Sequence, residues 1–201
     1  MDLFETDPES NLLPCDGTLN YHGRIFSMAE EQRFFETLLQ ADHWQQDELM
    51  MFGKRIITAR KVAWYGDPGS AYSYSGTTKQ PLAWTDVMLE LKQIVQHTAG
   101  LEFNSCLLNL YHHGGEGMGW HSDDEKALGG NPCIASVSFG AERKFSLKHK
   151  STSQAFSLIL ESGSLLVMKD TTQAHWLHSI PKTKKITTPR ISLTFRTIQT
   201  I

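Results

Sequence analysis

The chain has 201 residues, 40% of them hydrophobic and 20% charged, which is the composition of one globular domain. Its longest apolar runs, such as 165–168, are far shorter than the roughly 18 residues that cross a bilayer, and its first residues show no basic segment followed by an apolar stretch. This pattern excludes a disordered chain and a transmembrane helix. It predicts an intracellular protein without a membrane partner, cytoplasmic, or nuclear in a eukaryote, and we expect a monomer.

The formal net charge of −3 is an average over two unlike parts. Residues 1–48 carry eleven acidic side chains and two arginines, a balance of −9, whereas residues 49–201 carry eleven acidic and seventeen basic side chains, a balance of +6. The basic residues of the second part gather at 54–61, 143–150 and 182–185. This asymmetry indicates a polyanionic partner, although basic side chains on solvated strand edges would give the same pattern.

Two helices are predicted in the first hundred residues. A capping box at 27–30 precedes four apolar residues that share one helical face, which predicts a helix to about Asp42. A second helix is predicted from Thr85, its N-cap, to His97, with Gly100 as its stop.

After Gly100 the hydrophobic period changes from helical to alternating. Short runs separated by turn residues predict strands at 103–111, 133–139, 144–149, 155–161, 163–168 and 190–196. Because no helical crossover separates them, they predict an antiparallel sandwich or barrel. We therefore expect a single domain over 1–201, mainly β with flanking helices (α+β). Its parts are an acidic segment and helix over 1–48, a second segment and helix over 49–100, and a β core over 101–201, so that residues 1–100 form a helical and irregular cover.

Several common site types are absent from the sequence. The glycine cluster 114–119 lacks the G-K-S/T ending of a phosphate-binding loop, and no serine lies in G-x-S-x-G. Cys15, Cys106 and Cys133 show neither a CxxC spacing nor a nucleophile signature, which argues against a disulfide framework and a zinc knuckle.

The triplet His121-Ser122-Asp123 follows the glycine cluster. On an extended strand, residues two apart project to the same face, so His121 and Asp123 can offer two metal ligands at a strand end. Such a triplet is weak evidence alone, because it also arises by chance in a chain with nine histidines and 22 acidic residues. Far downstream, however, His175 and His178 follow another predicted strand.

The predicted strand 190–196 has two different faces. Three apolar residues alternate with Arg190, Ser192, Thr194 and Arg196, so two arginines and a threonine share one surface. Because an unpaired buried guanidinium is costly, an arginine that faces the interior needs an anion, and two arginines suit a dicarboxylate. Their Cα atoms lie about 20 Å apart along a strand, so they hold different ends of the ligand or one of them is structural.

Two histidines and one carboxylate on a β-sandwich, with further positions open, are typical of non-haem Fe(II) oxygenases. Three protein ligands leave about three positions on an octahedral iron, enough for a bidentate 2-oxo acid and O2. A nearby arginine would bind the distal carboxylate of that acid. Zinc-dependent hydrolysis is the competing interpretation, but it leaves Arg190 and Arg196 without an anion.

These residues resemble the motifs of the AlkB family of Fe(II)- and 2-oxoglutarate-dependent DNA dealkylation dioxygenases, over about residues 51–196. The family's Asn-x-Tyr strand corresponds to 109–111, its H-x-D to 121–123, its distal histidine to His178 and its closing R-x-x-x-T-F-R to 190–196. The resemblance implies a double-stranded β-helix (jelly-roll) core, with Fe(II) bound by His121, Asp123 and His178. It implies that 2-oxoglutarate is bound by Asn109, Tyr111, Arg190, Thr194 and Arg196. Because His178 is then the iron ligand, His175 either contacts one of the iron ligands or has a structural role.

The N-terminal part resembles the branch that acts on double-stranded DNA. The segment Met51-Phe52-Gly53-Lys54 matches that branch's finger, whose aromatic residue fills the gap left by an extruded base. The segment 65–76 matches its nucleotide-recognition lid, in which Tyr72 and Tyr74 would form an aromatic wall against the flipped base. Tyr74 stands where we expect Phe in the duplex-repairing mammalian relatives. Ordinary packing is the alternative role for these aromatic residues.

The resemblance also implies that Asp124 touches the base edge, with Glu125 nearby. It implies oxidative demethylation of N-alkylated DNA bases such as 1-methyladenine and 3-methylcytosine, with Fe(II), 2-oxoglutarate and O2 consumed and succinate, CO2 and formaldehyde released. The expected partner is alkylated DNA, as a duplex rather than a single strand, with phosphate contacts from Lys54, Arg55, Arg60 and Lys61. Two alternatives stay open: a related dioxygenase acting on RNA or protein, and a non-catalytic nucleic-acid binder.

Overall fold

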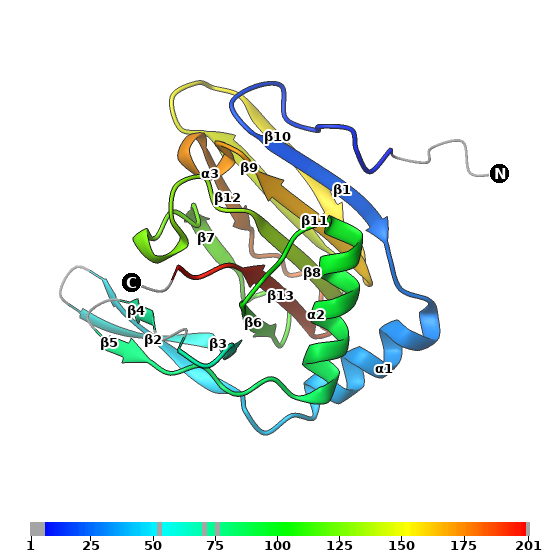
Figure 1. Ribbon diagram of the computed structural model, residues 1–201. Coiled ribbons are helices and arrows are strands. Elements are labelled where there is room, and N and C mark those ends of the chain that lie inside the picture. Colours follow the sequence, from blue (N-terminus) through cyan, green and yellow to red (C-terminus); the bar gives the residue numbers. More distant parts are fainter. Residues whose placement is uncertain (1–6, 52–53, 70–71, 75–76, 200–201) are drawn as a thin grey trace.

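A computed structural model describes residues 7–51, 54–69, 72–74 and 77–199 (Figure 1). The helices are α1 Met28–Leu39, α2 Asp86–Ala99 and α3 Thr172–His175, with a 3-10 turn at Lys126–Leu128. The strands are β1 Thr18–Arg24, β2 Gln45–Met51, β3 Lys54–Gly66, β4 Tyr72–Tyr74, β5 Thr77–Lys79, β6 Ser105–Tyr111, β7 Met118–His121, β8 Ile134–Gly140, β9 Arg143–His149, β10 Ala155–Leu160, β11 Ser164–Lys169, β12 Trp176–Ile180 and β13 Arg190–Arg196.

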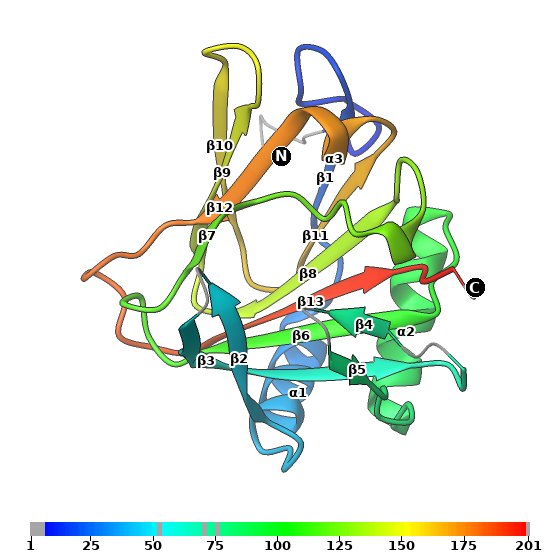
Figure 2. The same cartoon turned by 90° about the vertical axis from the view of Figure 1, so that its left-hand side faces the viewer.

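The strands form two antiparallel sheets that pack face to face (Figure 2). The larger sheet has seven strands in the order β1-β11-β8-β13-β6-β3-β2, and the smaller has four in the order β10-β9-β12-β7. Strands far apart in the sequence are neighbours, as β12 and β7 are, which is the connectivity of a jelly roll. The predicted antiparallel sandwich with flanking helices is confirmed.

The expectation that residues 1–100 form only a helical and irregular cover is wrong. β1 and the pair β2–β3 extend the larger sheet at its two ends, and β3 pairs with β6 from Lys61 to Gly66. The sequence of β3 carries polar side chains where a buried strand would carry apolar ones. Its half up to Arg60 pairs with β2 alone, and Arg60 lines an open cavity, whereas its half from Lys61 also pairs with β6 and buries Tyr65 under the helices.

The two long helices cover the outer face of the larger sheet (Figure 1). α1 begins after Ser27, whose hydroxyl accepts from the Glu30 N–H while the Glu30 carboxylate accepts from the Ser27 N–H. α2 begins after Thr85 and ends at Gly100, which adopts a left-handed φ of 64°. Both predicted helices are confirmed, although α1 ends at Leu39. Among the described helices, none is long and apolar enough to cross a membrane.

β13 separates two environments. Its residues Ile191, Leu193 and Phe195 lie in the core under the helices, whereas Arg190 and Arg196 bond to groups between the sheets, so the predicted alternation is confirmed. Apolar side chains from both sheets fill part of that interior, including Phe145, Leu147, Leu166, Met168 and Trp176. The remainder opens as a cavity of about 570 Å³ between the sheets.

Candidate metal centre and anion pocket

Three predicted metal ligands come together at one edge of the smaller sheet. His121 is the last residue of β7 and pairs with His178 of β12, and their ring centroids lie 4.2 Å apart. Asp123 follows in the loop after β7 rather than on the strand itself, and its Oδ1 atom is 3.9 Å from His121 Nε2. One potential ligand atom from each residue lies within 4.8 Å of the other two. The three side chains therefore converge on one point.

The protonation states of the buried pair suit metal binding. Burial lowers the pKa of His178 to about 3, so its imidazole is neutral near pH 7. For Asp123, burial acts to raise the pKa, but the charges of Arg196, His178 and His121 outweigh it and leave the pKa below its usual value. A nitrogen lone pair and a carboxylate are thus available without the loss of a proton.

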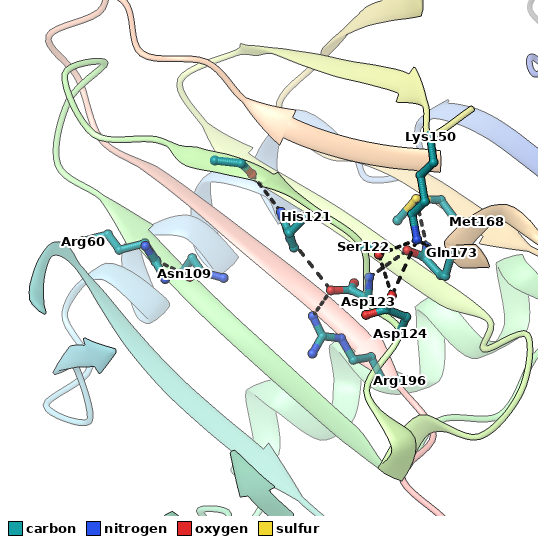
Figure 3. A network of polar contacts seen from close by, with 11 residues as sticks. Arg60, Asn109, His121, Ser122, Asp123, Asp124, Lys150, Met168, Gln173 and Arg196 are labelled. Atoms are coloured by element: carbon teal, nitrogen blue, oxygen red, sulfur yellow. Dashed lines mark hydrogen bonds and ion pairs between the residues drawn. The ribbon is translucent and has the colours of Figure 1, made fainter. Parts of the chain in front are cut away.

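Asp123 is held from two sides (Figure 3). Arg196 Nη2 donates a hydrogen bond of 3.0 Å to Asp123 Oδ1, and the Asp123 backbone N–H donates one of 2.9 Å to Gln173 Oε1. His121 is oriented by a contact of 2.9 Å between its Nδ1 and the Gly119 carbonyl oxygen, while its Nε2 faces Asp123. Partners that fix the orientation of a ligand are typical of metal sites.

A second feature is a buried guanidinium with unused donors. Arg190 is 2% exposed, and its Nη2 donates a hydrogen bond of 2.9 Å to Ser138 Oγ. Its Nε and Nη1 atoms have no hydrogen-bond partner among the described residues. Burial lowers the pKa of Arg190 to about 10, so the group stays charged near neutral pH. A buried charge with two unused donors fits an anionic ligand.

Tyr111 lies between Arg190 and another buried arginine. Its ring centroid is 5.5 Å from Arg190 Cζ and 5.9 Å from Arg143 Cζ. Arg143 Nη2 donates to the carbonyl oxygens of Glu116, at 2.8 Å, and Pro181, at 2.9 Å. Arg143 therefore ties the glycine-rich turn to the segment after β12, beside the unused donors of Arg190.

The other predicted co-substrate residues lie on neighbouring strands. Asn109 is buried, lines the cavity, and accepts a hydrogen bond of 3.0 Å from Arg60 Nε. Thr194 is half-buried and lies between the two arginines on β13. Arg60, which was predicted to contact DNA phosphates, lines this cavity. Its contact with phosphates stays a prediction.

The predicted substrate residues are described in part. Phe52 and Gly53 lie outside the described residues, while Lys54 belongs to β3 and Tyr72 and Tyr74 belong to β4. The short strand β4 pairs only with β5, as a separate hairpin beside β3 in Figure 2. The finger and lid assignments stay predictions.

Two neighbouring carboxylates differ in their surroundings. The Asp124 side chain is 62% exposed, accepts from Ser122 Oγ at 2.9 Å and lies 3.6 Å from Lys150 Nζ (Figure 3), and Asp124 is not among the residues that line the cavity. Glu125 lines the cavity, and its buried Oε2 atom has no hydrogen-bond partner among the described residues. In this structure Glu125, rather than Asp124, faces the space that a base would fill.

Sequence reasoning missed the supporting residues Gln173 and Arg143. Gln173 is 1% exposed and lies in the short helix α3, where no local motif distinguishes it. Arg143 was counted in a basic surface group, yet it is 2% exposed. Its position at the start of an alternating strand, in register with the buried Phe145, was the available signal.

One other group of potential metal ligands occurs among the described residues: Cys15, Asp16 and His149. His149 Nδ1 accepts hydrogen bonds from the backbone N–H groups of Ser151, at 3.2 Å, and Thr152, at 3.1 Å. Because a neutral imidazole has one lone pair, Nε2 carries the proton and donates it to Asp16 Oδ2 at 3.2 Å. No lone pair remains for a metal, so this group is structural.

A sequence profile of the 2OG-Fe(II) oxygenase superfamily matches residues 18–196, which include the three converging side chains and both arginines of β13. The chain belongs to this superfamily. The oxygenase is 39% identical over 197 residues to the DNA oxidative demethylase ALKBH2 of Mus musculus, covering 92% of this chain and 80% of the relative. It is 39% identical over 185 residues to the Homo sapiens protein of the same name, covering 87% and 71%.

A third relative is the alpha-ketoglutarate-dependent dioxygenase alkB homolog 3 of Bos taurus, 38% identical over 181 residues, with 85% of this chain and 63% of the relative covered. These relatives identify the oxygenase as a member of the AlkB family. It is an enzyme that uses Fe(II), 2-oxoglutarate and O2.

Two solved structures share the fold. The structure of OsALKBH1 has a TM-score of 0.61 at 18% identity and covers 92% of this oxygenase and 98% of that chain. A prolyl hydroxylase from Trichoplax adhaerens, in complex with a peptide fragment, has a TM-score of 0.62 at 12% identity and covers 90% and 83%. At these identities the likeness concerns the jelly-roll architecture alone.

Proposed function

We propose that this dioxygenase reverses alkylation of DNA by oxidative demethylation of bases such as 1-methyladenine and 3-methylcytosine. The observation that carries the proposal is the buried Arg190, whose two unused donors lie on the same strand as Arg196, the partner of Asp123. This arrangement suits a dicarboxylate that reaches toward the three converging side chains. The 39% identity to proteins named DNA oxidative demethylase supports DNA as the substrate.

The residues present fit the cofactors. His121, Asp123 and His178 would hold Fe(II), and Arg190 with Tyr111 would bind the distal carboxylate of 2-oxoglutarate. Asn109, Thr194 and Arg196 would contact the remainder of the acid. The bound iron and its co-substrates supply the oxidising chemistry, in which 2-oxoglutarate leaves as succinate and CO2 and the alkyl carbon leaves the base as formaldehyde.

The protein's own contribution is orientation and the exclusion of water. Arg196 and Gln173 fix the Asp123 carboxylate. The cavity is of the size found in small-molecule sites, and apolar side chains line part of it, namely Trp64, Leu82, Leu107, Leu128 and Ile198. Such walls pack against the flat faces of a nucleobase and displace water from it.

The base edge would be read by a carboxylate. Asp124 is our candidate from the sequence, and it would have to turn from Ser122 and Lys150 toward the cavity. Glu125 already lines the cavity with an unpartnered oxygen. Either carboxylate would accept a hydrogen bond from the exocyclic amino group that adenine and cytosine share.

We also propose that the enzyme acts as a monomer and takes its lesion from duplex DNA. The finger segment 51–54 and the lid segment 65–76 support this, because an inserted aromatic residue replaces the stacking lost when a base leaves a duplex. Equal turnover of a duplex and its lesion-bearing single strand would count against the duplex preference.

The test is anaerobic addition of Fe(II) and 2-oxoglutarate, followed by O2 and an oligonucleotide that contains 1-methyladenine. We expect a weak visible charge-transfer band before O2 and one formaldehyde per base restored after it. His121→Ala should abolish both signals, whereas Ile159→Ala, at an exposed position on β10, should retain them. Formaldehyde release from methylated RNA or a methylated peptide, but not from DNA, would contradict the DNA substrate and identify RNA or protein as the substrate instead.

A further inference from the structure

β7 is irregular directly before His121. His121 pairs with His178 and Met118 pairs with Ile180, so three steps along β7 match two steps along β12, which is a β-bulge. A bulge inserts an extra residue and redirects a side chain, often beside an active site. Trp120 lies within this irregular stretch, is 45% exposed and also lines the cavity. Trp120 therefore belongs both to the wall of the cavity and to the surface of the protein.

Trp120 is oriented by a lysine from a different strand. Lys148 of β9 places its Nζ atom 4.6 Å from the centroid of the indole ring. This cation–π contact occupies one face of the ring and reduces its freedom to rotate. The side chain nevertheless keeps almost half of its surface exposed. An exposed, oriented aromatic ring beside a lysine is the arrangement on which unpaired bases stack.

The outer face of the smaller sheet is positively charged. Both long helices lie on the larger sheet, so no described helix covers this face (Figure 2). The four strands β7, β9, β10 and β12, all of which the structure describes, contain no aspartate or glutamate. The side chains of β9 and β10 that alternate with their inward-facing residues are Lys144, Ser146, Lys148, Ala155, Ser157 and Ile159.

We propose that, when the lesion lies in a single-stranded stretch of DNA, this face binds the strand that carries it, with Trp120 stacking on the unpaired base next to the lesion and the Lys148 and Lys144 ammonium groups contacting phosphates. The inference rests on the proposed function and names a contact of the same site. A lesion base in the cavity leaves its neighbour on the strand outside the cavity, and Trp120 is a lining residue that is also almost half exposed. The absence of carboxylates on these strands favours a polyanion over a basic peptide.

The binding test uses a fluorescein-labelled single-stranded oligonucleotide with a central 1-methyladenine and the Fe(II)-loaded enzyme without O2. Trp120→Ala should weaken binding about tenfold, and Trp120→Phe should recover most of the loss, because stacking tolerates any aromatic ring. Lys148→Met should lower the salt dependence of binding. Ile159→Ala, on the same face but on the edge strand β10, and Lys169→Met, on the larger sheet, should bind like the wild type.

An abasic nucleotide identifies the stacked base. Placed on one side of the lesion, it should weaken wild-type binding and leave Trp120→Ala unchanged. Placed two nucleotides further away, it should affect neither protein. If the abasic substitution weakens both proteins equally at every position, Trp120 does not stack on a neighbouring base and the proposal is overturned.

Turnover of a small substrate separates this proposal from the proposed function. Trp120→Ala should raise the KM for the oligonucleotide by a larger factor than the KM for 1-methyladenosine monophosphate, which has no neighbouring base. If the wild type releases no formaldehyde from any methylated substrate, the proposed function itself is wrong. Equal KM values for wild type and variant with the oligonucleotide would overturn only the role of Trp120.

Discussion

The Arg196 guanidinium donates a hydrogen bond of 3.0 Å to the Asp123 carboxylate, and so connects the last residue of β13 to the loop after β7. Asp123 is 3% exposed, and although burial acts to raise its pKa, the charge of Arg196 helps to keep that pKa below its usual value. The contact therefore orients the carboxylate and keeps it ionised. Arg196 acts on the metal site even before a co-substrate is bound.

Arg196→Gln should accordingly weaken Fe(II) binding in the absence of 2-oxoglutarate. Loss of a partner that orients a metal ligand lowers metal affinity by roughly 10- to 100-fold. Anaerobic calorimetric titration with Fe(II) measures this directly. Arg24→Gln, which removes an exposed arginine paired with Glu142 on the far edge of the larger sheet, is the matched control. Equal Fe(II) affinity in the two variants would contradict the role given to Arg196.

Arg190→Met should weaken 2-oxoglutarate binding and leave Fe(II) binding unchanged. The loss of charged hydrogen bonds of this kind is worth about 2 kcal/mol, or roughly 30-fold in Kd. 2-Oxobutyrate, which lacks the distal carboxylate, should bind the wild type and the variant equally. The apo variant should be at least as stable as the wild type, because a buried charge with two unused donors has been removed. A fall in its melting temperature would show that Arg190 is satisfied without a ligand.

The stability of the metal-free enzyme should fall as the pH drops below about 6.5. His178 has a folded pKa of about 3, far below the usual histidine value, so the unfolded chain takes up a proton that the folded chain refuses. The stabilisation is complete above the unfolded pKa and is lost progressively toward the folded pKa. Between pH 6.5 and 5 the loss from this one group is about 2 kcal/mol. Urea unfolding with a chelator present should show a shallower pH dependence for His178→Gln than for the wild type.

The enzyme should bind one transition-metal ion per chain. The second group, at Cys15, has its histidine lone pair engaged by two backbone N–H groups. Metal analysis after reconstitution should therefore give the same stoichiometry for Cys15→Ala and the wild type, and none for His121→Ala. A second equivalent that disappears in Cys15→Ala would show that the His149 loop rearranges to bind metal.

Short-range patterns were sufficient for much of the fold. The capping box at Ser27, the glycine stop at Gly100 and the alternation of β13 are local signals, and each describes the structure correctly. β3 was missed because its half up to Arg60 pairs with β2 alone and leaves Ile57 exposed, and because Arg60 lines the cavity of the site. A strand that lines a functional cavity does not show the alternation of an ordinary half-buried strand.

In the candidate site, too, local sequence patterns predict some features and miss those that depend on contacts between distant parts of the chain. The convergence of His121 and His178 depends on the pairing of β7 with β12, which no local spacing determines, and the family motif supplied that information. The supporting contacts of Gln173 and Arg143 depend on side-chain packing across the sandwich. Sequence patterns therefore named the ligands more readily than the residues that orient them.

β13 bonds to β6 on one side and to β8 on the other along its length. The distance between the backbones at Arg190 and Arg196 cannot change unless both ladders break. An arginine moved along this strand stays on the interior face only if it moves by two residues, a step of about 7 Å. The distance between the two arginines can therefore change only in steps of this size, and so can the length of the acid that fits between them. Relocating Arg190 along β13 could not adapt the enzyme to an acid one methylene longer or shorter.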